Sequence, residues 1–276
     1  VTGLARLPSG ALLVGVLGEG LVEVGVDLGV QESALVVGSA FITGVQPAPG
    51  GDVLVGTAYN GLWRVAGGRA LRSRLEGGPV VGLAAHADGV IVARTEGAML
   101  RTGRDTARPM DDGNGLRSGS PDLMGAVRHG GDRLVAGFDA GLLRMDADGG
   151  LTEVPLDLGG PATRRVNAVA SWQGLLCVGT EGGLFVLGAG GPWTVSEGAT
   201  HGLAVSEGRL AAATSAGVLT VDRDGQVARL DEDPAMQGSW MTVAFHGGAV
   251  WAGNMEGVVR FGRDAAWLTA DQGFTA

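Results

Sequence analysis

Side chains with binding chemistry precede several short apolar segments of this chain. They are Trp240 in QGSWMT, Arg164 and Arg165 in PATRRVN, and His201 in GATHGL, with Asn167 two residues after the arginine pair. An exposed tryptophan near arginines is a common anchor of recognition surfaces. We therefore predict that these residues bind a ligand or a protein partner. The alternative for Trp240 is that its ring packs between structural units or plugs a channel.

Polar side chains also recur in turns that end at a glycine. These residues are Glu19, Tyr59 with Asn60, Glu96, Asp139, Glu181 and Glu256. If the turns gather on one face, their carboxylates focus a negative potential that attracts a cation, an amine or a basic partner. We predict that they share a binding face with the first set. The alternative is that polar turns beside glycine simply favour acidic residues.

A short phrase that contains these turns recurs seven times and indicates the fold. Its second glycine stands at positions 20, 61, 97, 141, 183, 217 and 257, a period of about 40 residues. Short Val-, Leu- and Ala-rich runs broken by glycine turns are typical of strands. Each copy has four such runs, which predicts an all-β fold, a seven-bladed β-propeller with four-stranded antiparallel blades, as one domain over residues 1–276.

Small residues recur at one position of the first strand of each copy. Alignment places there Gly3, Gly44, Gly82, Gly125, Asn167, Gly202 and Thr242. Strands that converge on an axis tolerate least side-chain volume where their backbones come closest. The pattern therefore favours a closed ring over an open solenoid. The strand boundaries predict that the first and last blades meet by side-chain packing alone.

The remaining aromatic and thiol side chains have structural interpretations. Trp63, Trp193, Trp251 and Trp267 fall in apolar strands and are predicted to lie in the core. Trp172, in the turn SWQG, is predicted to be exposed on the opposite face. Cys177, the one cysteine, lies in LLCVGT and is predicted to be a buried small hydrophobe.

Three segments resemble the repeats of bacterial two-component-regulator propellers. They are VNAVASWQGLLCVGTEGGLF (166–185), GGDVLVGTAYNGLWRV (50–65) and GGAVWAGNMEGVVRF (247–261), and the linkers DDGNGLRSGSP and LTADQGFTA are similar to the family's inter-blade loop. The third and sixth copies, with ARTEG and ATSAG, lack the first glycine. The resemblance implies an exported seven-bladed propeller that senses a ligand or partner, usually fused to a membrane segment and signalling modules. A sensor role would make this chain an excised domain, and a free-standing secreted propeller is equally open.

Composition and motifs narrow the function. The net charge of −9 argues against nucleic-acid binding, and no apolar stretch approaches the roughly 20 residues of a membrane-spanning helix. His86, His129 and His246 are predicted to be structural, because equivalent positions on separate blades lie too far apart for one zinc. The run DDGNG from Asp111 lacks the ligand ladder of a calcium loop. Motifs of nucleophilic hydrolases, metalloproteases and nucleotide-binding loops are missing from the sequence.

We therefore predict a non-catalytic binding or interaction module without metal or cofactor, located in the periplasm or outside the cell. Its partner would be a small molecule, a glycan or a protein, with no nucleic acid and no membrane insertion. One alternative is a propeller lyase or glycan-active enzyme that uses carboxylates, or His201 with Glu181, at the channel mouth. Another is a structural assembly scaffold.

Overall fold

The structure is a computed structural model of the chain. It describes residues 1–7, 9–16, 18–25, 28–33, 41–48, 50–73, 79–86, 89–94, 97–101, 107–110, 123–146, 150–233, 237–262 and 265–269. The chain divides into two compact units. The first comprises Val1–Leu123, Met255–Val258 and Leu268–Ala276, and the second comprises Met124–Asn254 and Val259–Trp267. The single domain predicted over residues 1–276 stays a prediction.

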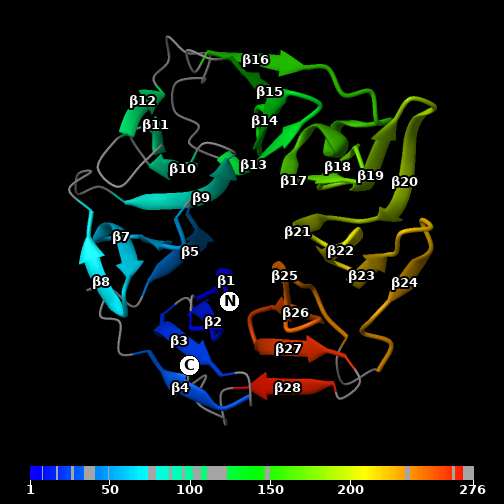
Figure 1. Ribbon diagram of the computed structural model, residues 1–276. Helices are drawn as coiled ribbons and strands as arrows, with labels where there is room; N and C mark the ends of the chain where they lie inside the picture. The colour runs from blue at the N-terminus through cyan, green and yellow to red at the C-terminus, as the bar shows by residue number, and fades with distance from the viewer. Residues whose placement is uncertain are drawn as a thin grey trace. The chain divides into compact units, whose positions relative to one another are not determined.

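Three four-stranded sheets make up most of the first unit (Figure 1). One contains β1 (Gly3–Arg6), β2 (Leu12–Val16), β3 (Gly20–Val24) and β4 (Val30–Glu32). The next contains β5 (Ile42–Pro47), β6 (Val53–Thr57), β7 (Gly61–Ala66) and β8 (Arg69–Arg72). The last contains β9 (Val80–His86), β10 (Gly89–Arg94), β11 (Gly97–Arg101) and β12 (Ala107–Met110). Strands β1 and β5 lie side by side, as do β5 and β9.

The second unit repeats the same design. Its sheets contain β13 (Leu123–His129), β14 (Asp132–Gly137), β15 (Gly141–Met145) and β16 (Leu151–Val154), then β17 (Val166–Trp172), β18 (Leu175–Thr180), β19 (Gly183–Gly188) and β20 (Gly191–Glu197). They continue with β21 (Thr200–Ser206), β22 (Arg209–Thr214), β23 (Gly217–Val221) and β24 (Val227–Arg229). A short helix, η2 (Pro161–Arg164), precedes β17, and β17 lies beside β21.

A further sheet contains β25 (Thr242–His246), β26 (Ala249–Gly253), β27 (Gly257–Phe261) and β28 (Ala266–Thr269), and most of its residues belong to the second unit. The described residues thus form seven four-stranded sheets, each with its strands in sequence order. The predicted all-β fold of four-stranded antiparallel sheets is confirmed. The way in which the first and last sheets meet stays a prediction.

Tight glycine turns join the strands. Gly130 and Gly131 both have positive φ (57° and 94°), as do Gly247 and Gly248 (58° and 76°). Two consecutive positive φ values are the requirement of the type I′ hairpin turn, whose twist matches that of the strands. The hairpins written GG in the sequence therefore adopt the conformation that only glycine reaches without strain.

The hydrophobic core is divided among the interfaces between consecutive sheets. In the first unit one cluster joins Leu13 to Val55, and in the second unit one joins Cys177 to Leu210 and another joins Ala213 to Val250. Strand β6 is buried along its whole length, whereas β24 is exposed throughout. Second strands are apolar on both faces because a neighbouring sheet covers each face, and outer strands carry the polar residues.

First strands approach each other closely at glycine, as predicted. A Cβ added to Gly3 would lie 2.5 Å from the backbone nitrogen of Val45, and one on Gly202 would lie 3.3 Å from the carbonyl oxygen of Met241. The alignment of Asn167 with these glycines is wrong. Gly202 pairs with Ala213 across its hairpin, and in the preceding sheet it is Ala168 that pairs with the corresponding Gly179. Asn167 is instead the extra residue of a bulge in β17 and corresponds to His201, the residue before Gly202 in β21.

Candidate functional site

A buried threonine fixes the turn between the second and third strands of three sheets. The hydroxyl groups of Thr57, Thr180 and Thr214 donate to the carbonyl oxygens of Gly61, Gly183 and Gly217, at 2.8, 3.1 and 2.8 Å. Each hydroxyl also accepts a backbone N–H of its own turn. These bonds replace the water contacts that the turns would otherwise need, so residues such as Asn60 and Glu181 sit on rigid supports.

In the same three sheets, the loop before the first strand binds this turn. In the second unit the amide of Glu181 donates to the carbonyl oxygen of Arg165 at 3.1 Å, and the amide of Ser215 donates to Ala199 at 2.8 Å. In the first unit the amide of Ala58 donates to Phe41 at 2.9 Å. The two kinds of segment that the sequence assigns to one face therefore lie at the same end of these sheets.

Several first strands carry a β-bulge at this end, among them β5, β17 and β21. The pairing register shifts between Ile42 and Gly44 in the first unit, and between Val166 and Ala168 and between Thr200 and Gly202 in the second. The extra residues are Thr43, Asn167 and His201. A bulge re-aims a side chain and often lies beside a functional site. Asn167 and His201 thus occupy equivalent positions on the neighbouring strands β17 and β21.

Arg165 connects two sheets of the second unit. Its Nε lies 3.8 Å from Asp139 Oδ1 in the β14–β15 turn, and its guanidinium carbon lies 5.2 Å from the centroid of the Phe138 ring. The side chains of Arg165 and Asp139 are 56% and 59% exposed. Because water screens such a pair, its contribution to stability is small. The guanidinium group of Arg165, stacked on the Phe138 ring, is instead exposed to solvent.

Asn167, two residues after Arg165, is buried and orients a carboxylate. Its Nδ2 donates to Glu181 Oε1 at 2.8 Å, and the asparagine side chain lies almost wholly out of solvent. Glu181 itself is half-buried, and so is His201 on the next first strand. The structure therefore gathers five of the predicted residues, Arg165, Asp139, Asn167, Glu181 and His201, on adjacent strands and turns. We call them the inner-strand cluster.

Arg164 lies at the end of η2, next to the cluster. A Cβ on Gly182 would lie 2.8 Å from Thr163 Cγ2, and one on Gly141 would lie 3.4 Å from the Arg164 carbonyl oxygen. Close approach at these two glycines seats η2 against the turns on either side of it. The Arg164 side chain is exposed and lines a hollow of about 260 Å³ in the loop between β16 and β17.

The other predicted turn residues lie elsewhere. Tyr59 is 68% exposed in the first unit, where its ring meets Phe41 edge-on with centroids 5.2 Å apart, and Asn60 is half-buried beside it. Glu19 and Glu256 are exposed, and both belong to the first unit. Glu96 lies outside the described residues. A shared ring of carboxylates stays a prediction, and in the second unit Asp139 and Glu181 already have the partners described above.

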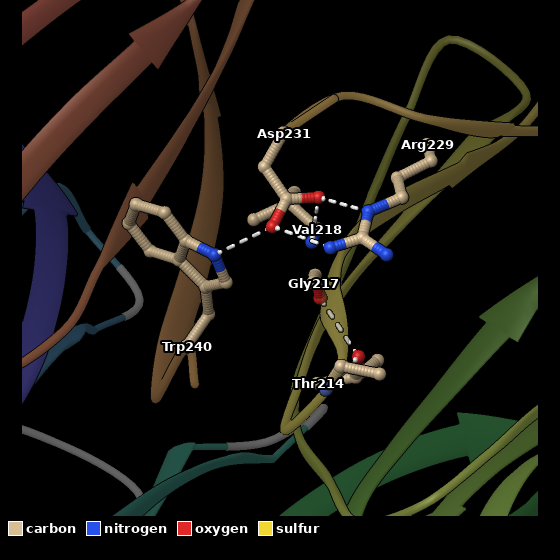
Figure 2. Close-up of polar contacts among 7 residues, drawn as sticks. Thr214, Gly217, Val218, Arg229, Asp231 and Trp240 are labelled. Carbon is tan, nitrogen blue, oxygen red and sulfur yellow. Dashed lines mark hydrogen bonds and ion pairs between the residues drawn. The ribbon is translucent and has the colours of Figure 1, made fainter. Parts of the chain in front are cut away.

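Trp240 is not an exposed anchor. Its ring is 0% exposed and packs edge-on against Phe261 and Trp267, with centroids 5.8 and 5.7 Å away. Its Nε1 donates to Asp231 Oδ2 at 3.1 Å (Figure 2). Of the two alternatives for this residue, packing between sheets is the correct one.

Asp231 is a residue that the sequence analysis missed. It is fully buried, and its Oδ1 accepts from the amide of Val218 at 3.2 Å and from Nε of Arg229 at 2.8 Å. Figure 2 shows the carboxylate between the indole of Trp240 and the guanidinium of Arg229. Asp231 thus ties the loop before β25 to β23 and β24. The surrounding LDEDP reads as an ordinary acidic turn, so no local signal indicates this role.

Two further tryptophan predictions are corrected. Trp172 is 2% exposed rather than open to solvent, because Nε1 donates to the Gly208 carbonyl oxygen at 2.7 Å and the ring packs edge-on against Trp193. Trp193 is 38% exposed rather than core, since β20 is the outer strand of its sheet. Trp251 is buried as predicted, and Trp63 and Trp267 are half-buried against core clusters.

The histidines have separate environments. His129 Nδ1 lies 3.1 Å from Ser171 Oγ, a pairing that the sequence analysis did not foresee. No described residue hydrogen-bonds to the other ring nitrogen, so the pair lacks the third group that orients a catalytic base. His246 is buried beside Trp251, and the side chain of His86 lies outside the described residues. Within the described ranges, no three His, Cys, Asp or Glu residues gather as a metal site would require.

No protein-family profile matches the chain, and no curated protein matches it. Several solved structures match the chain. The extracellular domain assigned to a hybrid two component system of B. thetaiotaomicron matches with a TM-score of 0.74 and 18% identity, over 96% of this chain and 38% of that one. Virginiamycin B lyase from Staphylococcus aureus matches with a TM-score of 0.71 and 11% identity, over 92% of this chain and 91% of that one.

The β-propeller domain of a protein from Myceliophteria thermophila matches with a TM-score of 0.62 and 16% identity, over 92% of this chain and 93% of that domain. At such identities the likeness shows the fold alone. The chain has a β-propeller fold of four-stranded antiparallel blades, and it spans 38% of the length of that B. thetaiotaomicron extracellular domain. Among the described residues, no helix is long and apolar enough to cross a membrane.

Proposed function

We propose that this chain is a ligand- or protein-binding propeller module that works outside the cytoplasm, as a sensor or interaction domain, and that it binds through the inner-strand cluster. One observation carries the proposal: an exposed guanidinium stacked on Phe138 belongs to a loop residue, Arg165, whose carbonyl oxygen accepts a hydrogen bond from the backbone amide of Glu181. Preorganised charged and aromatic groups bind partners at a low entropic cost. The likeness to the extracellular domain of a hybrid two component system supports the location and the class of function.

The cluster offers several kinds of contact within a small area. Arg165 supplies a planar donor, Asp139 and Glu181 supply acceptors, and His201 adds an imidazole ring with two nitrogens that can form hydrogen bonds. Such a set suits a polar small molecule, a glycan or a loop of a protein partner. We further propose the finer architecture that the repeat predicts, in which the seven sheets close into one seven-bladed ring.

Thermal shift measurements test the proposal with a matched control. The probes are maltose, benzoate, spermidine and calcium chloride, because a ligand of the folded state must raise the melting temperature. We expect at least one probe to stabilise the wild type, and Arg165→Gln to remove that shift. Arg144→Gln is the control, since Arg144 forms an equally long ion pair of 3.8 Å with Asp132 at 56% exposure, outside the cluster. Equal shifts in both variants, or none in the wild type, would refute small-molecule binding at Arg165.

A protein partner makes a different prediction. If no probe binds but a photo-crosslinker introduced at Asp139 captures the same partner from extracts in which the crosslinker at Asp132 captures none, the module is an interaction domain. If the sites at Asp139 and Asp132 behave alike, a rim-based scaffold becomes the better interpretation.

The lyase alternative has one specific observation in its favour. Virginiamycin B lyase matches this chain over nine-tenths of both lengths. Glu181, held by Asn167, and the half-buried His201 would be the acid and base candidates. Consumption of virginiamycin B, followed by chromatography, tests this alternative. Turnover that Glu181→Gln abolishes would favour the enzyme, and no turnover by the wild type would remove it.

A further inference from the structure

The hollow beside Arg164 is lined by charged and apolar side chains. It lies within the loop between β16 and β17 and has a volume of about 260 Å³. Its lining includes Leu156, Asp157, Leu158, Pro161, Thr163 and Arg164. The size is below the ~300–1,000 Å³ typical of sites for drug-sized ligands. The hollow therefore suits a molecule smaller than a typical drug, with an apolar part.

Two side chains of opposite charge line this hollow and form no ion pair with each other. Arg164 and Asp157 are both exposed. Within the described part of the chain neither side chain forms an ion pair or a hydrogen bond, whereas Arg165 next in sequence is paired with Asp139. A guanidinium binds a carboxylate through two parallel hydrogen bonds, and a carboxylate binds an ammonium group. A ligand that carries both groups would satisfy both residues.

The framework of the hollow is fixed by local contacts. Thr163 is buried, its hydroxyl donates to the Gly160 carbonyl oxygen, and its methyl group faces the Gly182 turn. Leu156 packs on the core cluster that contains Val166. The residues on either side of the hollow are therefore anchored to neighbouring sheets. Such support keeps the two charged side chains on one loop of defined shape.

We infer that the hollow binds a small zwitterion, an α-amino acid or a dipeptide, with its carboxylate on Arg164 and its ammonium group on Asp157. The apolar side chain of the ligand would lie against Leu156, Leu158 and Pro161. This inference rests on the proposed ligand-binding function, and it assigns a ligand class to a site next to the inner-strand cluster.

Isothermal titration with four related probes tests the inference. Leucine and glycyl-leucine carry both charges, N-acetyl-leucine lacks the ammonium group and leucinamide lacks the carboxylate. We expect the two zwitterions to bind the wild type, and each blocked probe to bind about tenfold more weakly, because one charged contact is lost. Arg164→Gln should make leucine and leucinamide bind alike, and Asp157→Asn should make leucine and N-acetyl-leucine bind alike. Arg144→Gln should change none of these ratios.

Each other outcome overturns the inference. Binding of N-acetyl-leucine as tight as that of leucine would make the hollow an anion site, and absence of leucine binding to the wild type would exclude a zwitterion. Ratios that change equally in Arg144→Gln would show a general charge effect. The Arg165 experiment uses probes that are not zwitterions and a residue outside the hollow, so either proposal can fail while the other stands.

Discussion

Trp240 donates its indole N–H to the buried carboxylate of Asp231 across a 3.1 Å hydrogen bond. The two residues stand nine positions apart, on either side of a loop between two sheets. Asp231 also binds Val218 and Arg229, so one side chain serves three segments. An aspartate taken out of water is tolerated only when its oxygens are hydrogen-bonded. This carboxylate therefore helps to hold the loop before β25 in place.

Replacing Trp240 by phenylalanine isolates the hydrogen bond, because most of the ring packing remains. We expect Trp240→Phe to lower the free energy of unfolding by about 2–3 kcal/mol, as for hydrogen bonds to charged groups. Trp251→Phe is the matched comparison, since Nε1 of that buried tryptophan donates to the neutral carbonyl oxygen of His246 at 3.2 Å. Its cost should be about 1 kcal/mol. Urea denaturation gives both values, and equal costs would mean that the Asp231 charge adds nothing.

Gly217 tests how tightly the same carboxylate is enclosed. A Cβ at this position would lie 2.5 Å from Asp231 Oδ1, and the backbone φ is 149°. Gly217→Ala should therefore destabilise the fold by about 2–4 kcal/mol, through steric overlap and backbone strain together. Gly190→Ala, at a site with no atom within 4 Å of the added carbon, should change stability by less than about 1 kcal/mol. Similar melting temperatures for the two variants would contradict the close contact at Gly217.

The sequence predicted the strands and turns well because their signals are local. Thr57, Thr180 and Thr214 each precede a glycine-ended turn, and each forms the hydroxyl bonds that such a turn needs. The loops and turns assigned to one face also meet at the same end of their sheets. Period and turn chemistry depend on neighbours within a few residues, so one sequence suffices to find them.

Burial of individual side chains was harder to predict. Trp240 stands in a polar loop, and its partner Asp231 stands in an acidic one, so neither context indicates a buried pair. Trp193 stands in an apolar run, yet it belongs to an outer strand. In β17 it is Ala168, not Asn167, that takes the glycine position, and no change of composition marks this offset of one residue. These features depend on contacts between sheets, which the spacing of one repeat does not record.

The contact between Asn167 and Glu181 predicts a pH-dependent variant. Asn167→Asp would set two carboxyl groups at the 2.8 Å contact that now joins amide and carboxylate. Like charges at this separation raise one pKa of the pair above its value of about 4 in the unfolded chain. A carboxyl group whose pKa is raised in the folded protein contributes its full stability at pH values below its pKa in the unfolded chain. This contribution is lost as the pH rises through its pKa in the folded protein. The variant should therefore lose about 2 kcal/mol at pH 7 and recover much of it near pH 4.

Asn167→Leu provides the control for that measurement, because it removes the hydrogen bond without adding a charge. Its stability deficit relative to the wild type should change little between pH 7 and pH 4. Denaturation curves of all three proteins at both pH values make the comparison. A deficit of Asn167→Asp that is the same at both pH values would show that the two carboxyl groups do not interact.

Cys177 offers a test of the core at alkaline pH. Its thiol is buried in β18, and burial raises its pKa from 9.0 to about 12. The unfolded thiol ionises near pH 9, whereas the folded one stays neutral, so stability is lost as the pH rises from about 9 towards 12. At pH 10 the loss should be about 1.4 kcal/mol. The sequence has no Lys and one Tyr, so few other groups titrate in this range. The change in the free energy of unfolding between pH 7 and pH 10 is measured for the wild type and for Cys177→Ala, and the difference between the two changes is the contribution of the thiol. A difference near zero would mean that water reaches Cys177 in the folded protein.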